Sequence, residues 1–188
     1  MRTILALTLA FALGAALPGA IAQTLPPPPS GFQSTPNQAS AQMKAAGGGD
    51  AVEATKANDT MSDCFGDPKI RFAYSWILNP MAKNYVEMLA KVPADPASTR
   101  PMGGYLDEPV SKEAYNGGVL EWRKQTWPVI TGHPCKDKEV VFYNAVWTGY
   151  VSGKLIGISV DRLYNSKGQG QGWIDEYIEK VKGALNSK

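Results

Sequence analysis

An alternating apolar segment in the last third of the chain constrains the fold most. From Val140 to Val151, apolar residues occupy both alternate sets of positions, as in a strand that is apolar on both faces for much of its length. Ser152-Gly153 then provides a tight turn, and Leu155 to Val160 returns as the antiparallel partner. The sequence therefore predicts a central antiparallel hairpin.

Helical patterns lie on both sides of this hairpin. Asp67-Pro68 is a typical helix start, and the apolar residues at 70, 73, 74, 77 and 78 follow one helix face. Asn79-Pro80 repeats the start signal before a second apolar stripe, which consists of Met81, Tyr85, Met88, Leu89 and Val92. This pattern predicts two helices, or one kinked helix, over 68–92.

Two further helices are expected. Ser111 can cap a helix through Gln125, although Gly117-Gly118 weakens its middle. After a polar, glycine-rich connection at 165–172, the last helix places five apolar residues on one face: Ile174, Tyr177, Ile178, Val181 and Leu185. The predicted fold class is α+β, a helix-rich single domain over 63–188 with a central hairpin and a C-terminal amphipathic helix.

The segment 23–62 differs in composition from the predicted domain. It contains four consecutive prolines, Pro26 to Pro29, and three consecutive glycines, Gly47 to Gly49. Phe32 is its only aromatic residue, so we expect no core of its own. Four prolines favour an extended polyproline II conformation. The segment is predicted to be an extended arm, either a solvated spacer or a tether that becomes ordered on a partner.

The first 22 residues resemble a secretory signal. Arg2 gives a positive start, Ile4 to Leu17 is apolar, and Ala20-Ile21-Ala22 matches the small-x-small cleavage pattern. The apolar run is shorter than the roughly 20 residues needed to span a bilayer. We therefore expect a chain exported to a bacterial periplasm, with membrane association only through partners.

Export determines how the two cysteines are interpreted. In an oxidising compartment, a pair of cysteines usually forms a disulfide, so Cys64 and Cys135 are predicted to be joined. A metal site at His133 and Cys135 is the alternative, but two ligands fall short of the four of structural zinc. A Cys-x-x-Cys-His motif is absent from the sequence, which excludes covalent c-type haem.

The motifs name no reaction. His133 is the only histidine and is interpreted as an ordinary loop residue. Asp107-Glu108 and Asp161-Arg162 are interpreted as solvated loop charges. Gly168-x-Gly170-x-Gly172 is one residue short of the dinucleotide-binding fingerprint and is predicted to be a turn or hinge. The net charge of +2 argues against a nucleic-acid partner. We expect no catalytic residue, no metal and no cofactor in this chain.

Aromatic residues are abundant, with five tryptophans and eight tyrosines. Trp76 and Trp147 are expected in the core. Trp122 and Trp127 lie near an irregular turn and are candidate exposed anchors of an interface, together with Phe32 from the arm.

Two stretches carry a resemblance to a known family: Asp63-Cys64-Phe65-Gly66-Asp67-Pro68 and the stretch from Trp127 to Cys135. With the export signal and the size of about 20 kDa, the chain resembles the small third subunit of the membrane-bound quinoprotein alcohol dehydrogenase of acetic acid bacteria. The resemblance implies a cofactor-free accessory subunit that supports stability or assembly. The larger dehydrogenase and cytochrome c subunits would carry the quinone cofactor and haem c, oxidise ethanol and pass electrons to ubiquinone.

Two other classes of protein remain open. Trp127-Pro128 and Trp147-Thr148-Gly149 are similar to parts of the cone-shaped domain of nuclear transport factor 2 and polyketide cyclases. Such a small enzyme or ligand-binding domain would rely on His133 with an aspartate. The third possibility is a free-standing periplasmic binding or immunity protein.

Overall fold

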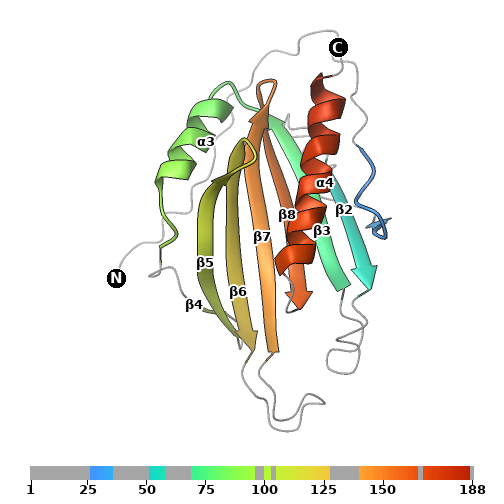
Figure 1. Cartoon of the computed structure of the whole chain (residues 1–188), viewed down its shortest axis with the longest axis vertical. Helices are drawn as coiled ribbons and strands as arrows, with labels where there is room; N and C mark the ends of the chain where they lie inside the picture. Colours follow the sequence, from blue (N-terminus) through green and yellow to red (C-terminus); the bar gives the residue numbers. More distant parts are fainter. Residues whose placement is uncertain are drawn as a thin grey trace.

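The computed structural model describes residues 26–35, 51–57, 69–95, 100–102, 105–127, 140–164 and 167–186. These ranges form eight strands and two helices (Figure 1). The strands are β1 (Gln33–Thr35), β2 (Ala51–Ala57), β3 (Lys69–Leu78), β4 (Arg100–Met102), β5 (Tyr105–Tyr115), β6 (Gly118–Trp127), β7 (Val140–Val151) and β8 (Lys154–Tyr164). The helices are α3 (Ala82–Lys91) and α4 (Lys167–Asn186).

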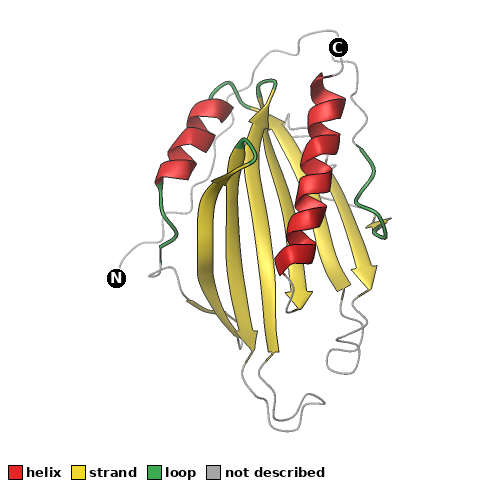
Figure 2. Ribbon diagram, viewed as in Figure 1, coloured by secondary structure: helices red, strands yellow, loops and turns green. Residues whose placement is uncertain are grey.

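All eight strands belong to one antiparallel sheet in the order β1-β2-β3-β8-β7-β6-β5-β4. Strands form most of the described part of the chain, as Figure 2 shows by colour. The prediction of a helix-rich domain is therefore wrong. The central hairpin is confirmed, because β7 and β8 pair through a turn at Ser152 and Gly153, both with positive φ.

The segment predicted as a helix over 68–78 is strand β3. Ile70, Phe72 and Tyr74 are buried at alternate positions, which is a period of two. Ala73 and Ile77, on the other face, are also apolar, so the same run fits a helical pattern equally well. Periodicity alone does not separate the two structures for a short run with some apolar residues on its second face.

The helix predicted from Ser111 to Gln125 is instead the hairpin of β5 and β6. Asn116 and Gly117 form its two-residue turn, with φ of 47° and 78°. Both residues must have positive φ in a type I′ turn, which Asn-Gly adopts at low cost. The dipeptide is thus a hairpin signal and not a weak point in a helix.

The segment predicted as an extended arm supplies two strands of the sheet in its described ranges. β1 pairs with β2, and β2 pairs with β3 over its full length from Ala51 to Ala57. Phe32 is only 9% exposed, and its ring lies 5.7 Å from that of Phe72 and 4.9 Å from that of Trp173 between centroids. The described residues therefore show that the folded unit begins before residue 63.

The helices predicted at 81–92 and near the C-terminus are confirmed as α3 and α4. The backbone N–H of Met81 donates to the Asn79 side chain at 2.8 Å in the turn before α3, but the N-cap residue is Met81 and not Asn79. α4 begins earlier than predicted and includes the glycines that the sequence assigned to a connection. A Cβ at Gly170 would overlap Leu163, so this glycine allows the first turns of α4 to approach the sheet.

The main core lies between α4 and one face of the sheet. The five apolar residues predicted on one side of α4 are all buried. Trp147 of β7 lies across Gly118 and Gly149, where any Cβ would overlap its indole ring. Its indole N–H donates to the carbonyl of Tyr115 at 2.9 Å. Large aromatic side chains thus fill the space under α4.

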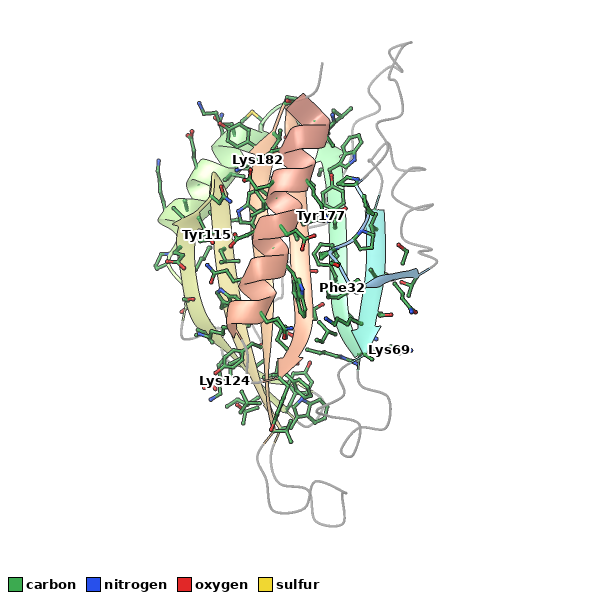
Figure 3. The ribbon with its side chains drawn as sticks, turned by 45° about the vertical axis from the view of Figure 1, so that its right-hand side comes forward. Phe32, Lys69, Tyr115, Lys124, Tyr177 and Lys182 are labelled. Carbon is green, nitrogen blue, oxygen red and sulfur yellow. The ribbon has the colours of Figure 1, made fainter. Side chains whose placement is uncertain are left out.

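α3 lies against the opposite face of the sheet, where it contacts β5, β6, β7 and β8 (Figure 3). Ala82 and Val86 are buried but do not belong to the core under α4. We call the side of the sheet that carries α3 the α3 face, and the other side the α4 face. Neither described helix is long and apolar enough to cross a membrane.

Candidate functional site

The residues chosen for their chemistry lie largely outside the described residues. This holds for Cys64, Cys135 and His133, so the disulfide and the alternative metal site stay predictions. Within the described ranges, no three His, Cys, Asp or Glu residues come together as metal ligands would.

Of the three predicted interface anchors, two are buried in the core of the α4 face. Phe32 is 9% exposed and Trp122 is 3% exposed. Trp127 is half-buried and stacks on Tyr105, with 4.8 Å between ring centroids. None of these three side chains therefore extends from the surface.

The adjacent carboxylates Asp107 and Glu108 lie on a strand and not in a loop. Because they are neighbours on β5, they point to opposite faces of the sheet. The Arg123 guanidinium donates from Nε to both oxygens of the buried Asp107, at 3.0 and 3.1 Å. Lys124 pairs with Glu108 at 3.7 Å. Each carboxylate has its own cationic partner, so the two do not form an acid–base pair.

Two tyrosine hydroxyl groups make hydrogen bonds on the two sides of α4, one from Tyr115 of β5 and one from Tyr177 of α4 itself (Figure 3). On one side, the Tyr115 hydroxyl donates to Asp175 at 2.9 Å and accepts from Gln171 at 2.8 Å. The Gln171 amide lowers the pKa of Tyr115, but burial and the Asp175 carboxylate raise it more. On the other side, the Tyr177 hydroxyl donates to the carbonyl of Pro26 at 2.9 Å. These bonds hold α4 and the N-terminal segment in place.

The α3 face carries an exposed apolar stripe. Its members follow α3 and both of its ends, and we call them the α3 stripe: Leu78 (63% exposed), Met81 (60%), Tyr85 (41%), Met88 (54%) and Val92 (50%). Tyr85 and Met88 lie on one side of α3, Met81 and Val92 are its cap residues, and Leu78 is the last residue of β3. The stripe lies about a quarter turn from Ala82 and Val86, which face the sheet.

Beside α3, the same face of the sheet is hollowed by a shallow cavity of about 360 Å³, which we call the trough. Its floor is formed by small residues from three adjacent strands, with Val146 of β7 beside them. The floor residues are Ala51, Ala73, Ser75, Gly157 and Ser159. Small side chains on neighbouring strands leave room above the backbone, so a ligand can approach closely.

A second cavity of about 400 Å³ adjoins the trough and shares Glu53 and Ala73 with it. Its lining is more polar, with Arg71 of β3 directly opposite Asp161 of β8. Burial raises the pKa of Asp161, and the Arg71 and Arg162 guanidinium groups only partly offset this rise. We call this region the polar corner.

A β-bulge shapes the polar corner. Asp161 and Arg162 lie opposite the single residue Asn144 of β7, where the pairing register shifts. Arg162 has a φ of 63°, and its backbone N–H donates to the Asn144 side chain at 2.9 Å. Bulges of this kind redirect side chains and occur often beside binding sites.

Comparisons with protein-family models, with curated proteins and with solved structures find no match. The fold and the α3 face therefore have to be interpreted from their own geometry.

Sequence reasoning identified the apolar members of the α3 stripe but assigned no function to them. The signal that was missed is that α3 has two apolar sides, one with Ala82 and Val86 and the other with Met81, Tyr85 and Met88. A helix that lies on a sheet buries only one side, so the second side remains exposed. The trough carries no comparable signal, because the small residues of its floor are spread over three strands that lie far apart in the sequence.

Proposed function

We propose that the protein is a non-catalytic accessory subunit of an exported, membrane-associated quinoprotein alcohol dehydrogenase complex, and that it docks through the α3 stripe. The larger dehydrogenase and cytochrome c subunits would hold the quinone cofactor and haem c. The role of this chain would be to support their stability or assembly. The observation that carries the proposal is the α3 stripe, five large apolar side chains that are each at least 41% exposed.

The occupant that fits the α3 stripe is an amphipathic helix of the larger subunit. Met81, Tyr85 and Met88, at spacings of four and three along α3 and its N-cap, form a short apolar seam against which a second helix can pack. Lys83 and Glu87 pair with each other at 3.9 Å on α3 itself. Neither residue belongs to the α3 stripe, so the stripe itself is apolar and none of its side chains carries a charge that would lose its water when a partner binds. Methionines at two of the five positions adapt to the surface of a partner.

The small-enzyme alternative receives less support from the α4 side. A cone-shaped enzyme domain binds its substrate between its helices and its bent sheet. In the described part of this protein, Trp147, Tyr74 and Tyr177 fill that space, each at most 2% exposed. The α3 face is therefore the better candidate for function.

The proposal can be tested by purifying the tagged full-length protein in mild detergent and identifying the proteins that come with it. Wild type should retain a quinoprotein dehydrogenase and a cytochrome c. Met88→Glu places a charge in the centre of the α3 stripe, and burying that charge would be costly. We expect it to reduce the retained partner by at least about tenfold, as for an interface hot spot.

The matched control is Ala90→Glu, which adds the same charge to the same helix on a different side. Ala90 is exposed and outside the α3 stripe, so this variant should retain the partner. Equal retention by both variants would show that α3 is not the docking helix. Recovery of partners that are not redox enzymes would refute the assignment to a dehydrogenase complex.

A further inference from the structure

The trough and the polar corner form one continuous surface beside α3, because they share Glu53 and Ala73. Each cavity has a volume within the range of small-molecule sites, about 300–1,000 Å³. One end of the surface is apolar, and the other presents carboxylate, guanidinium and hydroxyl groups. A ligand that fills both must therefore combine an apolar body with a polar head.

The charges of the polar corner select the kind of head group. Arg71 and Asp161 lie directly opposite each other on paired strands, so their charges largely compensate. Glu53 has no such counterpart across the strands, because its register partners are the uncharged Thr35 and Ala73. The Arg71 and Arg162 guanidinium groups both act on Asp161, so Glu53 is the carboxylate of the corner without a charged register partner. Its charge favours a cationic head group beside it.

We propose that Glu53, where the two cavities meet, binds the ammonium group of a small organic amine whose apolar part lies over Gly157 in the trough. The Thr35 and Thr55 side chains line the same cavity and can accept further hydrogen bonds from the ammonium group. The hydrocarbon part then covers Ala51, Ala73 and Gly157 and comes alongside Val146.

The space above Gly157 makes this arrangement possible. A Cβ built at Gly157 would have only the Ser75 hydroxyl near it, at 3.7 Å, which is an ordinary van der Waals distance. The floor is thus open at its centre. A larger side chain at this position would fill the trough without a clash with the backbone.

The test is a titration of the full-length protein with three six-carbon probes, followed by the backbone amide signals in NMR spectra. Hexylammonium, 1-hexanol and hexanoate have the same hydrocarbon part and differ in head-group charge. We expect hexylammonium to bind with a dissociation constant on the order of 1 mM and to shift signals of residues 51–53, 73–75 and 157–159. Hexanol should bind several-fold more weakly and hexanoate at least about tenfold more weakly.

Two variants separate the roles of the head group and the trough. Glu53→Gln changes an exposed side chain and should bring hexylammonium to the affinity of hexanol. Gly157→Leu should block all three probes. Gly172→Leu, at an exposed glycine of α4 with no atom near a built Cβ, is the matched control and should bind as wild type does.

Each outcome decides for or against the amine site. The ammonium site would be refuted if the three probes bound equally well. It would also be refuted if Glu53→Gln left the affinity for hexylammonium unchanged. Stronger binding of hexanoate would assign the corner to an anion instead. Shifts that lie elsewhere in the chain would refute the location. If Gly157→Leu fails to fold, the Glu53→Gln comparison still decides the question.

Discussion

The two faces of the sheet are built from the same strands but differ in what they contact. On β7, Trp147 of the α4 face is 1% exposed, whereas its neighbour Val146 of the α3 face is 43% exposed. The α4 face buries large aromatic side chains under a helix of 20 residues. The α3 face presents small residues beside α3, a helix of 10 residues with one side exposed.

The difference indicates a division of roles within one sheet. Alternate residues of a strand point to opposite faces, so each strand can supply a core on one side and a binding surface on the other. The α4 face stabilises the fold, and the α3 face is the one to which we assign the proposed docking and ligand sites. Substitutions on the two faces should therefore differ sharply in their effect on stability.

The largest effect is expected for Trp147→Ala. Removing a fully buried indole leaves a cavity and should lower the free energy of unfolding by about 4–5 kcal/mol. Val146→Ala, at the adjacent position on the other face, should lower it by less than about 0.5 kcal/mol. Urea unfolding of both variants measures the contrast. Similar losses would show that both faces are equally buried in solution.

Phe32→Ala tests whether the N-terminal segment belongs to the α4 face. Phe32 packs edge-to-face on Trp173 and contacts Phe72, so its truncation should lower the free energy of unfolding by about 3 kcal/mol. The exposed neighbour Gln33 is the control, and Gln33→Ala should change stability by less than about 0.5 kcal/mol. An unchanged urea midpoint for Phe32→Ala would mean that the segment is not docked.

Tyr177→Phe removes a single hydrogen bond from the same face. Burial and the neighbouring Tyr74 raise the pKa of Tyr177 well above its ordinary value, so its hydroxyl remains a donor to Pro26 at all working pH values. Loss of this bond should lower the free energy of unfolding by about 1 kcal/mol. Tyr85→Phe, in the α3 stripe, should have no measurable effect in the same urea experiment.

The smallest effect is expected at Asp161 on the α3 face, where a substitution should raise the free energy of unfolding and not lower it. Burial raises the pKa of its carboxyl above 3.8 despite Arg71 and Arg162. The folded state then binds the proton more tightly than the unfolded state, so the ionised group destabilises the fold at pH 7, and this cost disappears as pH falls below 3.8.

Asp161→Asn should therefore be slightly more stable than wild type at pH 7. The difference should vanish near pH 3, where wild type is protonated as well. Urea unfolding at the two pH values provides the check. A variant that is less stable than wild type at pH 7 would show that attraction to Arg71 outweighs burial.

The α4 face could be predicted from the sequence in large part. The β7–β8 hairpin and α4 have clear periodicities, and the five residues that the pattern identifies on α4 are buried, together with Trp173. The remainder of the sheet could not be predicted in the same way, because Ala73 and Ile77 on the second face of β3 complete a pattern that fits a helix as well as a strand. For β5 and β6, the turn at Asn116 and Gly117 was the available signal.

The α3 face was less predictable because its features depend on tertiary placement. Whether a stripe such as Met81, Tyr85 and Met88 is buried depends on which side of α3 faces the sheet. The polar corner unites Glu53 with Asp161, more than 100 residues further along the chain. Only the strand order, which places β2, β3 and β8 side by side, brings them together.

The bond between Tyr177 and Pro26 also determines when the fold can be completed during synthesis. These residues are 151 positions apart, and β3 likewise waits for β8 as its neighbour. At 5–20 residues per second, the first described segment emerges on the order of 10 s before the helix that holds it. Until then, Phe32, Phe72 and Tyr74 lack the cover of α4. A nascent chain that stops before residue 167 therefore stays open, with its aromatic residues accessible to chaperones and proteases.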